Sequence, residues 1–117
     1  MTDQRDDDGV NNRNRNHLAN AALALSLEGF RGEMDAYDPR VHEARGVPGQ
    51  VSAASAVRRM VEGSQFTSEL GRRVFESGPR VQDPVSYRAA PQVHGACADV
   101  LVYIESVLDK ALNAASD

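Results

Sequence analysis

Few side chains in this sequence could carry out acid-base, nucleophilic or metal chemistry. Among its 117 residues are three histidines and one cysteine. His17, His42 and His94 lack the spacing of metal ligands, and one cysteine can form neither a zinc cage of CxxC pairs nor an internal disulfide. Cys97 falls within the apolar stripe of the last predicted helix, so we expect a buried, inert thiol. The residues therefore predict no catalytic set, no metal and no cofactor.

Two arginine pairs, Arg58-Arg59 and Arg72-Arg73, are the most suggestive basic groups. Fourteen residues separate them, which would return each pair to nearly the same face if one helix ran straight through both. Such a face could bind phosphate. However, three glutamates each lie four residues from one of these arginines, which is typical of a solvated face with ion pairs. These glutamates are Glu62, Glu69 and Glu76.

The overall charge and the absence of phosphate-binding loops also indicate which partners the chain is expected to lack. The net charge is −4, whereas affinity for a nucleic-acid backbone comes largely from unpaired Lys and Arg. Neither GxxxxGK[ST] nor GxGxxG occurs in the sequence, and these are the loops that commonly hold nucleotide phosphates. We therefore expect neither nucleic acid nor a nucleotide as a partner.

Arg88 and His94 are a further candidate pair. They enclose five residues, AAPQV, at the start of the last predicted helix. This spacing, in a small helical bundle, resembles the motif of HEPN ribonucleases, although Ala89 and Pro91 depart from the family pattern. The resemblance implies a dimer cleft in which His94 moves a proton and Arg88 stabilises phosphorane charge during attack by an RNA 2′-hydroxyl. One alternative function is therefore a metal-independent ribonuclease, or an inactive toxin-antitoxin relative.

The alanine-rich helical composition supports a second resemblance. Small helical chains of this kind are similar to type VII secretion substrates of actinobacteria and their relatives. The sequence has no Trp, so the Trp-x-Gly turn of that family is missing. No acidic residue lies four positions beyond Tyr37, Tyr87 or Tyr103, so the family's export signal is missing too. The resemblance implies a secretion-associated helical protein as a further alternative.

The elements that must position these side chains have helical periodicity. The first seam repeats at intervals of four, three, four and three residues, which places its members on one helical face. The seam consists of Leu23, Leu27, Phe30, Met34 and Tyr37. The last helix, of about 24 residues, carries an equally regular apolar stripe. That stripe consists of Val93, Cys97, Val100, Ile104, Val107 and Ala111.

Breaks between the helices are marked by Gly, Pro and capping residues. A middle helix is predicted to start near Ser52 and to kink or break at Gly63. Asp38-Pro39 predicts one short turn over 39–44, and Asp83-Pro84 predicts another. The sequence Ser77-Gly78-Pro79 has the composition of a helix stop.

These patterns predict an all-α fold, a small antiparallel bundle of three long helices with the middle one broken near Gly63. Residues 1–16 are mostly Asp, Asn and Arg, and we expect them to form a disordered N-terminal arm, followed by a single helical domain over 17–117. Leu, Ile, Val and Phe total 25 residues, just above the roughly 20% below which a chain struggles to form a core. The core should be thin.

The sequence also predicts a location. The longest apolar runs are five residues, far short of the about 18 needed to cross a bilayer. The N-terminus lacks the basic and apolar regions of a secretory signal. We therefore expect a cytoplasmic protein with no membrane contact.

The leading functional hypothesis from the sequence is a non-enzymatic helical module that docks onto a protein partner or onto itself. A thin core and stripes of small residues favour close helix contact between chains. The predicted contact residues are Leu23, Leu27, Phe30, Val102 and Tyr103.

Overall fold

The structure is a computed structural model that describes residues 4–75 and 81–114, with side chains described for 12–73 and 81–114. Every regular element within these ranges is a helix, so the predicted all-α fold is confirmed. The elements are α1 (Gln4–Phe30), the 3₁₀ turn η1 (Met34–Tyr37), α2 (Pro39–Arg45), α3 (Pro48–Val61), α4 (Glu69–Phe75), α5 (Val85–Arg88) and α6 (Ala90–Asn113).

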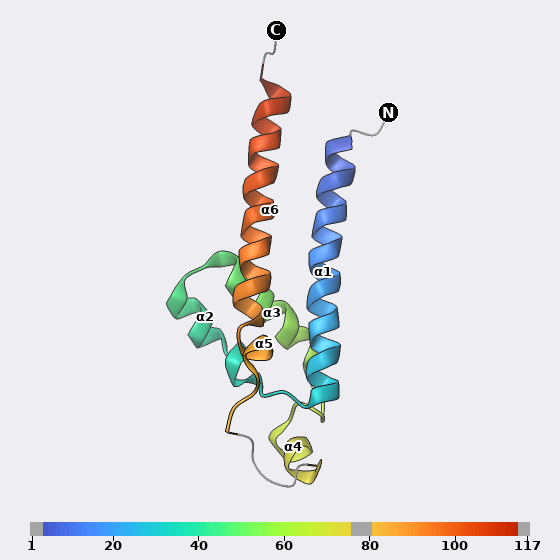
Figure 1. Cartoon of the computed structure of the whole chain (residues 1–117), viewed down its shortest axis with the longest axis vertical. Coiled ribbons are helices and arrows are strands. Elements are labelled where there is room, and N and C mark those ends of the chain that lie inside the picture. Colours follow the sequence, from blue (N-terminus) through green and yellow to red (C-terminus); the bar gives the residue numbers. More distant parts are fainter. Residues whose placement is uncertain (1–3, 76–80, 115–117) are drawn as a thin grey trace.

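Two long antiparallel helices, α1 and α6, dominate the molecule (Figure 1). α3 packs against both of them, and the outer halves of α1 and α6 extend beyond α3 toward the two chain ends. The molecule measures 68 × 31 × 20 Å and its radius of gyration is 17.8 Å. A compact domain of this length would have a radius of gyration of about 13 Å. The chain is therefore elongated, and much of its helical surface faces outward.

The predicted breaks lie close to those observed. Asp38 caps α2 by accepting a hydrogen bond from the Arg40 N–H at 2.8 Å, and α5 follows Asp83-Pro84. The middle helix ends at Val61, and Gly63 has a φ of 77°, a conformation that favours glycine. α3 starts at Pro48 instead of near Ser52, because proline is well suited to the first turn of a helix. The helix stop predicted at 77–79 lies outside the described residues.

The core is small and lies where the end of α1, η1 and α3 meet. Its buried members are Ala24, Leu27, Tyr37, Val57 and Val61. Leu23, Met34, Ala36 and Tyr87 pack around them and are partly buried. The core therefore holds the end of α1 to the 3₁₀ turn that follows it and to α3.

α3 and α6 approach each other through two glycines, Gly49 and Gly95. A Cβ atom on Gly49 would lie 2.2 Å from the Gly95 carbonyl oxygen, and one on Gly95 would lie 2.4 Å from the Gln50 backbone nitrogen. No side chain fits at either position without moving one of the helices. This contact fixes the start of α6 and therefore the position of His94.

Two expectations differ from the structure. α1 begins at Gln4, so most of the segment predicted as a disordered arm over 1–16 continues the first helix. Cys97 is exposed, as are its stripe neighbours Val93 and Val100, so the prediction of a buried thiol is wrong. Periodicity identifies residues that share a face, but it does not identify what covers that face.

None of the helices in the described ranges combines the length and the apolar character that crossing a bilayer requires.

Candidate functional site

The short segment from Gln82 to Arg88 is fixed to the end of α1 through a buried carboxylate. Asp83 is only 3% exposed, and its Oδ2 accepts a hydrogen bond from the Glu33 backbone N–H at 2.6 Å. The same oxygen would lie 3.3 Å from a Cβ atom on Gly32, which leaves little room for a side chain there. The carboxylate thus joins two parts of the chain that are 50 residues apart.

A buried tyrosine provides the second connection to this segment. The Tyr37 hydroxyl donates a hydrogen bond to the Tyr87 carbonyl at 2.7 Å. Burial raises the pKa of the Tyr37 phenol above its ordinary value of 10.0, and the negative charge of Asp83 raises it further. Tyr37 therefore stays a neutral donor at physiological pH. The Tyr87 ring stacks on Phe30 with ring centres 4.7 Å apart.

These connections position Arg88, the cation of the segment. Its Nε donates a hydrogen bond to the Asp83 carbonyl oxygen at 2.7 Å, and the residue is half-buried. This bond orients the guanidinium, and its two terminal nitrogens make no hydrogen bond to another residue in the described part of the chain. A guanidinium held in this way can bind a carboxylate through two parallel hydrogen bonds.

The structure does not bring His94 into the same network as Arg88. The His94 Nδ1 donates to Asn20 Oδ1 across the α1–α6 contact at 2.8 Å, because an amide oxygen can only accept. His94 lines a hollow of about 330 Å³ with Arg15, Cys97 and other residues of α1 and α6, and Arg88 is not among the lining residues. The two side chains proposed as one catalytic pair are held by separate partners.

The two arginine pairs do not share a face, because α3 and α4 are separate helices. Arg58 donates to the Tyr37 carbonyl at 2.7 Å, and Arg72 pairs with Glu33 at 2.6 Å. The predicted ion pair between Arg73 and Glu69 is present. Arg58 and Arg72 thus support the turns around Asp83 instead of forming a phosphate-binding surface.

His42 has a structural role. It is fully buried; its Nε2 donates to the Ala36 carbonyl at 2.8 Å, and its Nδ1 accepts from the Gln50 amide at 2.8 Å. Both ring nitrogens are occupied, so His42 connects η1, α2 and α3. Within residues 4–75 and 81–114, no three His, Cys, Asp or Glu side chains are placed to hold a metal ion.

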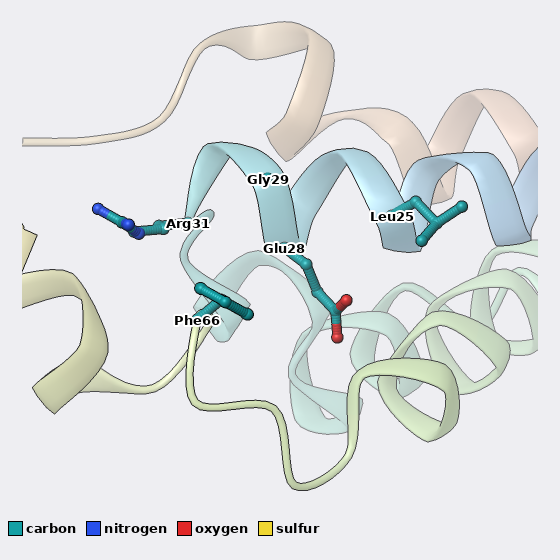
Figure 2. A pocket seen from close by; sticks show the side chains of 5 residues that line it. All are labelled: Leu25, Glu28, Gly29, Arg31 and Phe66. Carbon is teal, nitrogen blue, oxygen red and sulfur yellow. The ribbon is translucent and has the colours of Figure 1, made fainter.

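A second hollow, of about 260 Å³, lies between the end of α1 and the loop before α4. Figure 2 shows Leu25 and Glu28 along α1, Phe66 on the opposite loop and Arg31 directed away from Glu28. The Arg31 guanidinium lies 6.0 Å from the centre of the Phe66 ring. The hollow is shallow, and the connections to Asp83 do not reach it.

The residues predicted as a docking surface are dispersed. Leu27 is fully buried in the core, Leu23 packs beside it, and Phe30 stacks on Tyr87. Val102 and Tyr103 are exposed, as expected. From the sequence, Asp83 is recognisable only as the start of a turn, since its partner Glu33 is 50 residues away and no local pattern indicates that contact.

Comparison with known proteins identifies the family. The family model for aromatic amino acid lyases matches residues 11–117. Histidine ammonia-lyase from Caldanaerobacter subterraneus is 43% identical over 100 residues, which are 86% of this chain and 18% of the relative. The Geobacillus kaustophilus enzyme is 45% identical over 94 residues, or 80% of this chain and 18% of the relative. The Alkaliphilus oremlandii enzyme is 38% identical over 104 residues, or 89% of this chain and 19% of the relative.

These matches overturn the functional hypotheses drawn from the sequence. The similarity to these lyases covers nearly the whole chain. It contradicts all three hypotheses, namely a non-enzymatic docking module, a HEPN-like ribonuclease and a type VII secretion-associated protein. The chain spans about a fifth of the length of the curated relatives that it matches. Because the family model matches residues 11–117, the chain belongs to the aromatic amino acid lyase family.

Proposed function

We propose that this chain is part of an ammonia-lyase and takes part in the elimination of ammonia from histidine or another aromatic amino acid. The observation that carries the proposal is the 38–46% identity to histidine ammonia-lyases over most of the chain. In such an elimination the bond from the α-carbon to the amino nitrogen breaks and a proton leaves the β-carbon. The product is an unsaturated acid conjugated with the ring, together with ammonia.

Within this reaction we assign substrate binding to Arg88. Its guanidinium is oriented by the bond to the Asp83 carbonyl, and a fixed arginine is suited to the carboxylate of an amino acid. Asp83, Tyr37 and Glu33 are positioning residues, because they hold the segment that carries Arg88. The remaining groups for the reaction would come from the parts of a lyase that this chain does not span.

The proposal is tested by transplanting the chain into a relative. The matching segment of the Geobacillus kaustophilus histidine ammonia-lyase is replaced by residues 11–117, and ammonia release and ultraviolet absorbance of the product are measured with histidine. We expect the transplant to release ammonia. A transplant that folds and assembles like its host but releases no ammonia would refute the proposal. A smaller transplant of residues 81–94 addresses the same question if the larger one does not fold.

The role of Arg88 is tested within the transplant. Arg88→Gln should lower kcat/KM roughly a hundredfold, because charge-assisted hydrogen bonds to the substrate are lost. The matched control is Arg73→Gln, since Arg73 pairs with Glu69 on the exposed side of α4. The control should change kcat/KM less than twofold. Equal effects of the two variants on kcat/KM would contradict the role of Arg88 in substrate binding.

We also propose a cytoplasmic location. The exposed thiol of Cys97 supports it, because a reducing compartment keeps such a group from oxidation.

A further inference from the structure

A polar hollow of about 220 Å³ lies between α1 and α3, and Arg88 is not among the residues that line it. The α1 side consists of long polar side chains spaced three or four residues apart, which share one face of a helix. These are Arg13, Asn16, His17 and Asn20. The other sides carry mostly small residues, which leave the space open. They are Gly49, Ser52, Ala53, Ala56 and Arg59 of α3, and Ala98 of α6.

The charge of the hollow is positive and has no partner in the described chain. Its lining includes no acidic residue among those that the structure describes. Arg13 and Arg59 are exposed, and neither side chain makes a hydrogen bond or an ion pair within the described ranges. By contrast, Arg72 and Arg73 pair with carboxylates. A concave surface lined by one sign of charge concentrates ions of the opposite sign.

A buried amide adds a hydrogen-bond donor to this charge. Asn20 is only 4% exposed, and its Oδ1 accepts from the His94 ring. Its Nδ2, which can only donate, makes no hydrogen bond to another residue in the described part of the chain. A buried donor without a partner is costly. Because the Asn20 side chain lines the hollow, a molecule bound there would supply the missing acceptor.

Asp99 is an acidic side chain beside the hollow and opposes an anion there. A Cβ atom on Gly49 would lie 2.7 Å from the Asp99 Oδ1, so this carboxylate lies against the wall that Gly49 forms. Asp99 is not among the lining residues. Its single negative charge is smaller than the combined charge of Arg13 and Arg59, so the hollow keeps an excess of positive charge.

We propose that this hollow binds a phosphate group, either inorganic phosphate or a small phosphate monoester. One guanidinium suffices for a planar carboxylate, whereas here donors come from two helices and include arginine, amide, hydroxyl and imidazole groups. Such a set suits a tetrahedral anion with several acceptor oxygens. The hollow is smaller than the roughly 300–1,000 Å³ of sites for larger ligands, which favours a small ion. The inference does not depend on the proposed function.

The test is a titration of the full 117-residue chain with inorganic phosphate at constant ionic strength, followed by NMR of the side-chain N–H groups. We expect saturable binding with a Kd on the order of 1 mM, as for a small ion held by a few hydrogen bonds. The Nδ2 signals of Asn20 and the Nε–H signals of Arg13 and Arg59 should shift. The Arg88 Nε–H signal should not.

Variants of the two arginines test the site itself. Arg59→Gln and Arg13→Gln should each raise the Kd about tenfold, because each removes a charge-assisted hydrogen bond to the anion. The matched control is Arg45→Gln, which removes the same charge from an exposed arginine of α2 outside the hollow. It should raise the Kd less than about twofold, since salt screens distant charges. Circular dichroism checks that all three variants fold.

Titrations with methyl phosphate and acetate identify the chemistry of the ligand. Methyl phosphate that binds as tightly as inorganic phosphate would support the monoester, and methyl phosphate that binds much more weakly would support the free ion. Acetate that binds as tightly as phosphate would contradict a phosphate site.

Two further results would overturn the inference. Equal weakening by Arg45→Gln and Arg59→Gln would mean that phosphate is attracted by the overall charge of the surface. Asn20 signals that do not shift up to about 20 mM phosphate would mean that the hollow does not bind this anion.

Discussion

At the scale of single residues, Asp83 has the largest structural role in the candidate site. Its side-chain carboxylate accepts from the Glu33 N–H, and its backbone carbonyl accepts from Arg88. A buried carboxylate is costly unless hydrogen bonds compensate it. The Glu33 bond holds the carboxylate in place, and the backbone carbonyl of the same residue orients Arg88, the cation to which we assign substrate binding. The residue therefore connects the stability of the turn to the geometry of the site.

The first prediction concerns Asp38, the cap of α2. Hydrogen bonds from the Arg40 side chain, and then from its backbone N–H, lower the pKa of Asp38 from its ordinary value of 3.8 to about 2. A lowered pKa in the folded state means that the contribution of Asp38 to stability is complete above pH 3.8 and is lost as the pH falls toward 2. Carboxyl carbon NMR should give a midpoint near 2.

The control for this titration is Arg40→Ala, which removes the side-chain hydrogen bonds and keeps the backbone one. The midpoint of Asp38 should then rise toward 3.8 without reaching it. A midpoint near 3.8 in the unmodified chain would show that the ion pair does not form in solution.

The site could be predicted from sequence only in part, and His94 and Arg88 show why. Both were identified as residues able to do chemistry, but spacing alone paired them. In the structure Arg88 bonds within its own turn and His94 bonds to Asn20, 74 residues away. Contacts between residues so distant in sequence depend on the packing of whole helices, which local patterns do not specify.

At the scale of elements, the close approach of α3 and α6 leads to the second prediction. Gly95→Ala should lower the free energy of unfolding by on the order of 2 kcal/mol, because its Cβ would overlap the backbone at Gln50. Gly29→Ala is the matched control, since a Cβ on Gly29 meets nothing within 4 Å. It should raise the stability by up to about 1 kcal/mol through higher helix propensity. Urea denaturation measures the free energy of unfolding of both variants. Equal changes in the two variants would contradict the close contact between α3 and α6.

Helix positions were easier to predict than helix environments. The α2 cap, the break at Gly63 and the length of α6 follow from local backbone preferences. The start of α1 was missed because Asp, Asn and Arg carry no apolar periodicity, although they can continue a helix that is held elsewhere. The exposure of Val100 and Cys97 was missed because a regular stripe looks the same whether the chain itself or another molecule covers it.

At the scale of the whole molecule, the elongated shape and the small core have one explanation. The chain covers about a fifth of its relatives, and its radius of gyration of 17.8 Å leaves much helical surface outside the core. A small core supplies limited stability, because the fraction of its surface that a chain buries on folding falls as the chain becomes shorter. Contacts beyond the chain should therefore contribute measurably to its folding.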